Sequence, residues 1–380
     1  MKEEQAHFNW RRWWLVGLVI LIGGIGVIAV HFDARLYQQP LARITRVTNH
    51  RPVKQTDEFE NQDSQTNQQL TAVLINTQHR GQKLHITNTF SRSAAMDQAY
   101  HVGNQVFVTL PTHHNPSVIK GIKRDTTVAF LVWIIFSFLL IFMPRAGGLA
   151  VLSVLLNAGL FFGAIELDLT LKNANVFVIF SFVAIIFAFL TLWLVLGWRR
   201  QMLITFVATC SGTALAMLIS LSVFALTHER GMHYEGLQYV TTLPRPLFLA
   251  ETLLGSLGAV MDESTDIVAT LFELRRERPS ISARQLFISG RNVGRSIMGP
   301  LINVLLLIFV AETFPMTLLF LKNGNNWGYT YMMNMSLGVI QTLISGLGIV
   351  LAIPVASFVA SRLMSRIIPA KDKGGHDDNI

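Results

Sequence analysis

Apolar runs long enough to cross a lipid bilayer recur along this sequence, with short polar stretches between them. The first run, Trp13 to Val30, is uninterrupted and follows Lys2, Arg11 and Arg12. It can span a hydrocarbon core of roughly 30 Å. No small-residue cleavage pattern follows at residues 31–34, so the run predicts an uncleaved anchor and not a signal peptide.

Seven further apolar runs follow a long polar segment, which gives about eight predicted transmembrane helices. They cover residues 128–143, 149–165, 176–196, 202–226, 247–271, 297–320 and 332–360. The predicted parts are a cytoplasmic N-terminus at 1–12, an anchor at 13–30, an extracytoplasmic domain at 31–126, a seven-helix membrane domain at 127–361 and a cytoplasmic tail at 362–380. The fold class is an α-helical polytopic membrane protein with a small β-rich domain.

The polar segment at 31–126 has the composition of a domain outside the membrane. Its stretch from Asp57 to Gln69 is rich in Gln, Asn and Asp, which predicts a flexible tether. Leu70 to Ile75, Lys83 to Thr87 and Gln105 to Leu110 favour strands, with Gly81 and Gly103 at turns; these runs predict a barrel or a sandwich. His113 and His114 are adjacent and would point to opposite faces of a strand, so a solvated loop is a better interpretation than a metal site.

Composition and charge agree with this membrane topology. The chain has 51% hydrophobic and only 14% charged residues. Its basic residues flank apolar runs and do not form one basic face, so the net charge of +8 predicts no nucleic-acid partner. Arg199, Arg200, Arg275, Arg276 and Arg362 all fall on the side of the N-terminus, which places both termini in the cytoplasm. The single cysteine, Cys210, excludes a disulfide framework.

The run at 247–271 differs from the others because it contains four carboxylates: Glu251, Asp262, Glu263 and Asp266. An ionised carboxylate at the centre of a bilayer costs about 3 kcal/mol on insertion scales. Glu251 lies near the predicted outer surface, Asp262 near the middle and Asp266 towards the cytoplasmic end. Asp262 is therefore the acid whose burial is least favourable.

Helical periodicity separates these acids into two groups. Glu251, Gly255, Gly258 and Asp262 fall on one narrow stripe, with Asp266 close to it and Glu263 well off it. The two glycines predict that a neighbouring helix packs closely against this stripe. We therefore interpret Asp262, Asp266 and Glu251 as candidates for an ion or proton relay, and Glu263 as pointing elsewhere.

Polar residues on neighbouring helices are the candidate partners of the relay. The three that we select are Arg295, Asn303 and Gln341, while Asn334 and Ser345 share a face with Gln341. The alternative interpretation is structural: the acids would pair with Arg275 or Arg295 and lock two helices together. A relay and a lock differ in whether the acids titrate.

Several of these residues resemble a known family. Gly258-Ala-Val-Met-Asp262, Ser289-Gly-Arg-Asn-Val-Gly-Arg-Ser-Ile-Met298 and Asn303 are similar to the YibE/F-like family of bacterial multi-pass membrane proteins. The resemblance implies an anchor, an extracytoplasmic β domain and a helical block in a bacterial cell membrane, with no settled biochemical activity. This chain departs from the family at Asp266, where a small hydroxyl residue is expected.

A more distant resemblance involves the SecD/SecF translocase subunits of the resistance-nodulation-division superfamily. It is carried by Gly197-Trp-Arg-Arg200, Asp262 and Arg295-Ser-Ile-Met298. This resemblance implies proton-coupled work on an extracytoplasmic domain through membrane-embedded carboxylates, of which Asp262 would be one. If Glu273 is aligned instead, Asp266 takes the acidic position.

These observations predict a transporter or an export-assisting protein, driven by proton or sodium flow. The alternative is a non-transporting scaffold whose β domain recruits an envelope partner. An enzyme is not expected, since Asp262 and Asp266 lie on one helix and an aspartyl dyad needs two elements. The sequence contains neither a His-Glu-x-x-His motif nor a phosphate-binding loop, so we expect no catalytic residue, metal or cofactor. The expected partners are the lipid bilayer, an envelope protein and a second copy of the chain.

Overall fold

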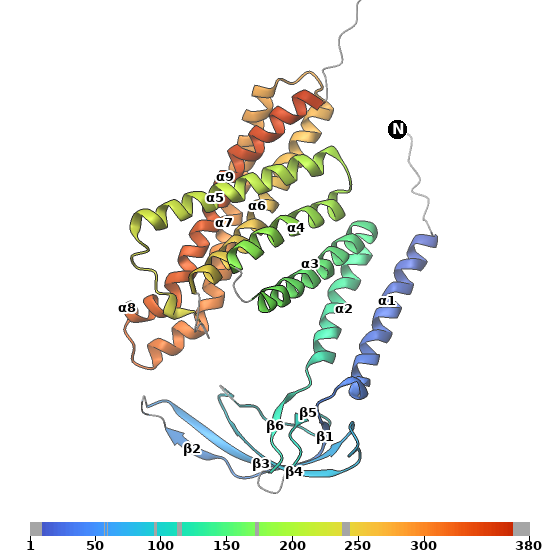
Figure 1. Cartoon of the computed structure of the whole chain (residues 1–380). Coiled ribbons are helices and arrows are strands. Elements are labelled where there is room, and N and C mark those ends of the chain that lie inside the picture. Colours follow the sequence, from blue (N-terminus) through green and yellow to red (C-terminus); the bar gives the residue numbers. More distant parts are fainter. Residues whose placement is uncertain are drawn as a thin grey trace, which may run out of the picture. The chain divides into compact units, whose positions relative to one another are not determined.

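The computed structural model describes residues 10–56, 58, 60–94, 97–111, 116–171, 175–237 and 244–367. The chain forms two compact units, residues 1–148 and 149–380, which are described separately (Figure 1). His113 and His114, for which we predicted a loop, lie outside the described residues.

The first unit is an antiparallel sheet that follows the apolar helix α1 in the chain and precedes the apolar helix α2. Its elements are α1 Trp10–His31, η1 Asp33–Leu36, β1 Leu41–Asn49, β2 Val53–Thr56, β3 Gln62–Leu74, β4 Lys83–Ser91, β5 Gln105–Val108, β6 Ile119–Ile122 and α2 Asp125–Phe142. The helices α1 and α2 pack against each other beside the sheet (Figure 1). Helix α1, the predicted anchor, is therefore paired with α2, which follows the sheet in the chain.

The six strands form one sheet, with β3 at its centre. Strands β1 and β2 pair with β3, β5 pairs with β1 and β6 with β5, while β4 pairs with β3 from Gln65 to Val73. Alternate residues of the long strands form the core against Tyr100. The predicted strands and the turns at Gly81 and Gly103 are confirmed, but the described strands form a single sheet and no sandwich.

The prediction of a flexible tether at Asp57–Gln69 was wrong, because β2 ends before this stretch and most of it is strand β3. Its amide side chains are partners of the neighbouring strands and do not remain free in solvent. The Gln68 amide is buried, donates to Asn49 Oδ1 at 2.9 Å and accepts a hydrogen bond from Asn88 at 3.0 Å. A polar strand can thus be ordered when its polar groups bond across the sheet.

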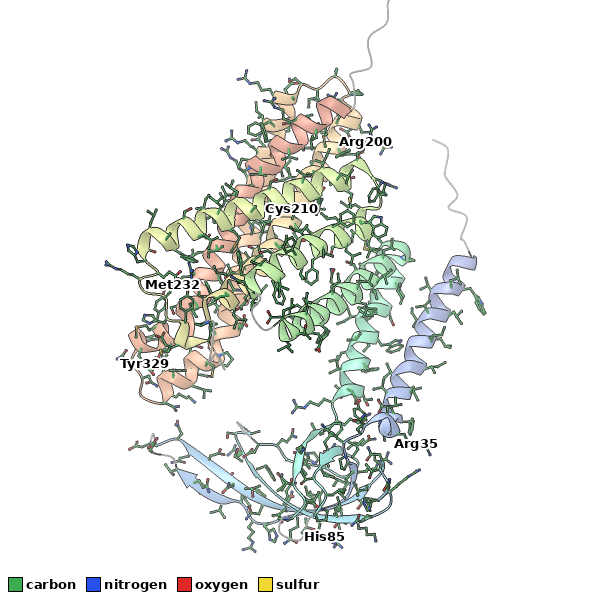
Figure 2. All side chains as sticks on the ribbon, viewed as in Figure 1. Arg35, His85, Arg200, Cys210, Met232 and Tyr329 are labelled. Atoms are coloured by element: carbon green, nitrogen blue, oxygen red, sulfur yellow. The ribbon has the colours of Figure 1, made fainter. Side chains whose placement is uncertain are left out.

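The second unit is helical. It contains most of α3 Pro144–Thr170, followed by α4 Val176–Leu196, α5 Arg200–Thr227, η2 Tyr234–Gly236, α6 Pro244–Glu277, α7 Ala283–Lys322, α8 Trp327–Thr330, the π-helical turn η3 Tyr331–Met335 and α9 Ser336–Ile367. Helix α9 packs along α5, α6 and α7, and α4 packs against α5 and α6. The single cysteine, Cys210, lies on α5 (Figure 2).

Seven helices of the described residues are long and apolar enough to cross a membrane. They are α1, α2, α3, α4, α5, α7 and the continuous run of α8, η3 and α9. The remaining predicted span, the sixth at 247–271, corresponds to α6, which is 34 residues long but has a lower mean hydropathy because of its charged residues. The helix that we selected from sequence is thus the polar exception among apolar neighbours.

Glycines bring α5, α6 and α9 together, but at different positions from those that we predicted. A Cβ atom at Gly348 would lie 2.8 Å from Val260 Cγ2, and one at Gly212 would lie 3.0 Å from Val260 Cγ1. The close-packing prediction for Gly255 and Gly258 was wrong within the described chain: Gly255 has ordinary contacts and Gly258 has none within 4 Å. The close approach therefore occurs on the Val260 side of α6, where both neighbouring helices supply glycine.

Candidate functional site: the carboxylates of α6 and a polar cavity

Helix α6 has one buried face and one open face. The buried face runs from Phe248 through Val260 to Leu271 and contacts α5 and α9. The open face includes Glu251, Asp262 and Asp266, all of which are exposed in the isolated chain. The three predicted relay residues therefore share the side of α6 that faces away from its helical core.

The end of α6 and the start of α7 are fixed by local hydrogen bonds. Ser282 and Gln285 form a capping box. The backbone N–H of Gln285 donates to Ser282 Oγ at 3.3 Å, and the backbone N–H of Ser282 donates to Gln285 Oε1 at 3.2 Å. The buried Arg275 side chain donates to the carbonyl of Ile281 across the turn. These contacts set the register in which α7 runs back beside α6.

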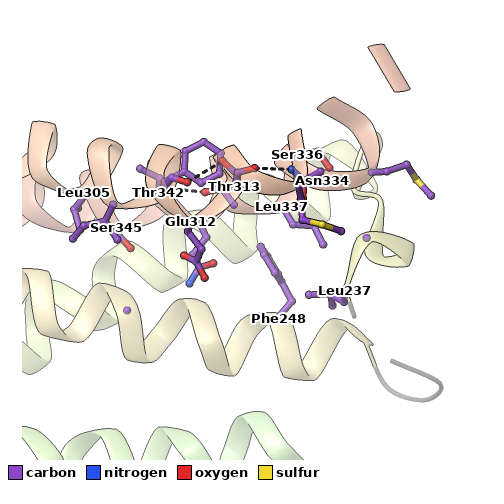
Figure 3. A pocket seen from close by; sticks show the side chains of 18 residues that line it. Leu237, Phe248, Leu305, Glu312, Thr313, Asn334, Ser336, Leu337, Thr342 and Ser345 are labelled. Carbon is purple, nitrogen blue, oxygen red and sulfur yellow. Dashed lines mark hydrogen bonds between the residues drawn. The ribbon is translucent and has the colours of Figure 1, made fainter. Parts of the chain in front are cut away.

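A cavity of about 330 Å³ lies between α6, α7 and α9. Its polar lining comes from Glu312 and Thr313 on α7, Asn334 on η3, and Gln341 and Ser345 on α9. Figure 3 shows Phe248 and Glu312 reaching into this space. The predicted common face of Asn334, Gln341 and Ser345 is confirmed, because all three line one cavity.

The π-helical turn η3 positions Asn334 at this cavity. Asn334 Nδ2 donates to the Thr313 carbonyl at 3.1 Å (Figure 3). It also donates to Thr317 Oγ1 at 2.9 Å. Its bonds therefore connect η3 to α7 along the cavity wall. Single π-helical turns inside longer helices are frequent at functional sites, since they re-aim side chains.

Glu251 is the predicted relay residue that the structure brings to a predicted partner. The Gln341 amide and the Glu312 carboxylate are both close enough to the Glu251 carboxylate to act on it electrostatically. One turn further along α6, a Cβ atom at Gly255 would lie 3.5 Å from Gln341 Nε2. Two carboxylates and an amide from three helices thus meet beside the cavity.

Asp262 and Asp266 form a separate pair on α6. They interact electrostatically with each other, since they lie four residues apart on one face. Neither is within ion-pair distance of a basic side chain among the described residues. Arg295 and Asn303 are exposed on α7 and make no ion pair or hydrogen bond with the described part of the chain. The structure therefore does not bring these two predicted partners to the aspartates.

Glu263, which we predicted to point elsewhere, is fully buried. Its exposed fraction is 0%, and neither carboxylate oxygen has a hydrogen-bond partner among the described residues. The sequence spacing could have indicated this burial. The residues Ser256, Val260, Glu263 and Ile267 follow one another at intervals of four, three and four. This is the pattern of a buried helix face, whereas the glycine stripe favoured the opposite side of α6 as the packed one.

The Glu229 carboxylate, in the connection between α5 and α6, binds two side chains near the cavity. Arg245 Nε lies 2.5 Å from Glu229 Oε1, and the Tyr234 hydroxyl donates to Glu229 Oε2 at 3.1 Å. Burial and the neighbouring Glu229 carboxylate raise the pKa of Tyr234 to about 12. Tyr234 therefore remains a hydrogen-bond donor, and its ring packs edge-on against Phe248 at the cavity.

Comparisons with known families cover both units of the chain. The model described as YibE/F-like protein matches residues 131–366, and that of the YibE/F family N-terminal domain matches residues 35–123. The chain belongs to the YibE/F-like family. The family resemblance inferred from the Gly258–Asp262 and Ser289–Met298 segments is thereby confirmed, and both segments lie within the larger match.

No curated protein and no solved structure matches this YibE/F-like chain. The more distant resemblance to SecD/SecF has no match among these comparisons. No group of three or more His, Cys, Asp or Glu residues suited to a metal ion occurs among the residues whose structure is described. The site is thus characterised by carboxylates and amides beside a cavity.

Proposed function

We propose that this YibE/F-like protein is a membrane transporter or an export-assisting protein, coupled to proton or sodium flow through carboxylates of α6. The observation that carries the proposal is the polar cavity against α6, where Glu251 meets Gln341 and Glu312. The face of α6 that contacts Gln341 at Gly255 continues to Asp262, which is seven residues or about 10 Å further along the helix. A cavity and a deeper acid on one helix face are the parts that ion coupling requires.

The proposed location is the cell membrane of a bacterium, with both termini in the cytoplasm and the sheet outside. Seven long apolar helices support a membrane location. Arginines before α5, after α6 and at the end of α9 support the orientation, because basic residues concentrate on the cytoplasmic side. The distant resemblance to SecD/SecF would make the extracytoplasmic sheet the part on which energy from ion flow acts.

Asp262 is the main titrating group in this proposal, Asp266 its helper and Glu251 the acid at the outer mouth. Among the described residues no cation pairs with these three acids, so a proton or a sodium ion is the charge that would balance them. Arg295 and Asn303 remain predicted supporting groups on α7. Gln341 acts at the cavity, where it contacts Glu251.

The test is Asp262→Asn in the full chain, reconstituted into liposomes. A membrane potential is imposed, and internal pH and uptake of radioactive sodium are both recorded. We expect ion-driven flux to fall by about tenfold or more, since removal of a proton-transferring group typically costs at least this factor. Glu273→Gln is the matched control: it removes an exposed acid of the same helix that pairs with Arg276 at 3.8 Å, and it should leave the flux unchanged.

Equal flux in the wild-type protein and Asp262→Asn would overturn the coupling proposal. A wild-type protein without any flux would favour the scaffold alternative, in which the sheet recruits an envelope partner. One feature supports that alternative: all four residues of β2, at the edge of the sheet, are exposed, and an open edge can accept another strand. Cross-linking from β2 then becomes the informative measurement, and failure to capture a stable partner would count against the scaffold.

A further inference from the structure

Glu263 and Arg275 are the two buried charged residues in the described part of the helical unit. Arg275 hydrogen-bonds the Ile281 carbonyl, whereas both oxygens of Glu263 lack a partner among the described residues. Buried carboxylates in folded proteins are normally paired or hydrogen-bonded. This sealed acid therefore requires an explanation other than an ion pair.

The surroundings of Glu263 follow from its neighbours on the same helix face. A Cβ atom at Gly348 of α9 would lie 2.8 Å from Val260 and 4.0 Å from Ser256, and one at Gly212 of α5 would lie 3.0 Å from Val260. Four residues after Glu263, Ile267 belongs to the core cluster that α5, α7 and α9 complete. Glu263 thus lies on the stripe where α6 meets the core, at the level at which its neighbours are small or apolar.

The elements packed against α6 offer Glu263 no charge. Helix α4 contains no charged residue, and the charged residues of α5, α7 and α9 whose side chains are described are all exposed: Arg200, Arg284, Arg291, Arg295, Glu312, Lys322 and Arg362. On α6 itself, Arg275 lies 12 residues or about 18 Å further along the helix. The charged group that acts on Glu263 is the Asp266 carboxylate, which has the same sign.

These surroundings determine the protonation state in which Glu263 can be buried. An ionised carboxylate without a partner, next to another acid, is strongly unfavourable in a low-dielectric interior. The neutral carboxylic acid avoids that cost. Two hydroxyl groups, of Ser264 on α6 and Thr209 on α5, are also buried without partners among the described residues. Thr209 lies about one turn before Gly212, the residue of α5 that approaches Val260. Because α5 runs antiparallel to α6, these hydroxyls occur at about the level of Glu263.

We propose that Glu263 is a proton-binding site, which holds its proton while sealed between α5, α6 and α9 and exchanges it with Asp266. The two residues are three positions apart, so their side chains are neighbours on the helix surface. In the exchange, the O–H bond of Glu263 breaks as an O–H bond forms on the Asp266 carboxylate. The pair keeps one proton and one negative charge throughout. Asp266, which is exposed, then passes the proton to solvent or to Asp262.

This inference builds on the proposed proton-coupled function, but its test requires no transport. Infrared difference spectra of the purified full chain are recorded as pH is varied. We expect the carbonyl stretch of a protonated carboxylic acid at neutral pH in the wild-type protein, and its loss in Glu263→Gln. Glu273→Gln is the control, because it removes an exposed carboxylate of the same helix that lies near Arg276, and it should leave the band in place. Asp266→Asn should shift the pH at which the band disappears.

Identical spectra for the wild-type protein and Glu263→Gln would overturn the proposal, and so would loss of the band in Asp262→Asn alone. If Glu263→Gln does not fold, Glu263→Asp retains an acid at the site and should move the band in frequency or in pH midpoint. A band assigned to Glu263 together with absent ion flux would refute the proposed transport and leave the proton site standing. Ion flux that depends on Asp262, in a protein without an infrared band from Glu263, would support the proposed transport and refute the proton site.

Discussion

The two units of this protein differ in whether their buried ionisable side chains have partners. In the sheet unit, the Lys123 side chain is 2% exposed, and its ammonium lies 2.7 Å from Asp33 Oδ1 and 3.2 Å from Asp125 Oδ1. It also donates to the Val30 carbonyl at 2.5 Å. In the helical unit, the Glu263 side chain is also buried but has no partner among the described residues. Lys123 is therefore compensated within the fold, whereas Glu263, the acid that we propose to hold a proton, has no such partner among the described residues.

Neutral polar groups show this contrast only in part, because Gln105 Oε1 and Ser137 Oγ of the first unit are also buried without a partner among the described residues. Asn76 in the sheet unit is buried, accepts from the Leu41 amide at 2.7 Å and donates to the carbonyls of Tyr37 and Gln39. The hydrogen bond from the Tyr37 hydroxyl to Asp125, with burial and the nearby acids, raises the pKa of Tyr37 to about 12 and keeps it a donor. In the helical unit, Thr209, Thr213, Ser264 and Ser357 have buried hydroxyls without partners in the described residues. These unsatisfied groups lie on α6 and on the helices α5 and α9 that pack against it.

The largest effect in this comparison is expected from Lys123→Met. Removing the ammonium leaves Asp33 and Asp125 facing each other, so we expect the sheet unit to lose about 3 kcal/mol of folding stability. Thermal unfolding of the full chain, with hydrogen exchange at β5 and β6, measures this loss. Lys120→Met removes an exposed lysine of β6, three residues before Lys123, and is the control. If both variants unfold alike, Lys123 is not the structural charge that we describe.

Glu263→Gln is expected to change folding stability less than Lys123→Met does, and the change can have either sign. Glutamine has the shape of the protonated acid, and no ion pair is lost, so stability at neutral pH should change by less than about 1 kcal/mol. The same thermal measurement applies, with Asp33→Asn as the contrasting variant because Asp33 has a cationic partner. A loss for Glu263→Gln as large as that for Lys123→Met would show that Glu263 is compensated after all.

Hydropathy alone predicted much of the helical unit. The ends of α4 and α5 match the predicted runs at 176–196 and 202–226 closely, because a long apolar segment has few alternatives to a helix. The common face of Asn334, Gln341 and Ser345 also followed from periodicity. The place of α9 between three other helices did not, since it depends on contacts that no single segment encodes.

Two of the predictions from sequence were wrong for physical reasons. The stretch before Leu70 was predicted to be a tether because its residues are polar, but cross-strand bonds such as Thr89 to Asn67 at 2.8 Å order it. The stripe with Gly255 and Gly258 was predicted to be the packed face of α6, so Glu263, which points away from that stripe as predicted, was set aside. In the structure, glycines Gly212 and Gly348 belong to the neighbouring helices and make room for the opposite face of α6. Packing partners therefore determined which acid is buried.

The smallest effect concerns Asp63, a partly exposed carboxylate of the sheet unit that accepts several hydrogen bonds. The Ser93 hydroxyl donates to it at 2.6 Å and the Ser64 amide at 2.7 Å. The Ser93 hydroxyl foremost, and then the Ser64 amide, lower the pKa of Asp63. A carboxyl whose pKa is lowered on folding adds stability above its unfolded pKa, and this contribution is lost as pH falls through the folded pKa.

We therefore expect Ser93→Ala to be less stable than the wild-type protein at neutral pH, with the difference vanishing in acid, where Asp63 is protonated in both proteins. Unfolding of the two proteins as a function of pH measures this. Thr89→Ala is the control, because its hydroxyl bonds the neutral Asn67 side chain and its effect should not depend on pH. A pH-independent loss in Ser93→Ala would mean that the hydroxyl serves packing alone. The acids of the sheet unit would then be supplied with donors for reasons other than their charge, and the contrast with α6 would rest on Lys123 alone.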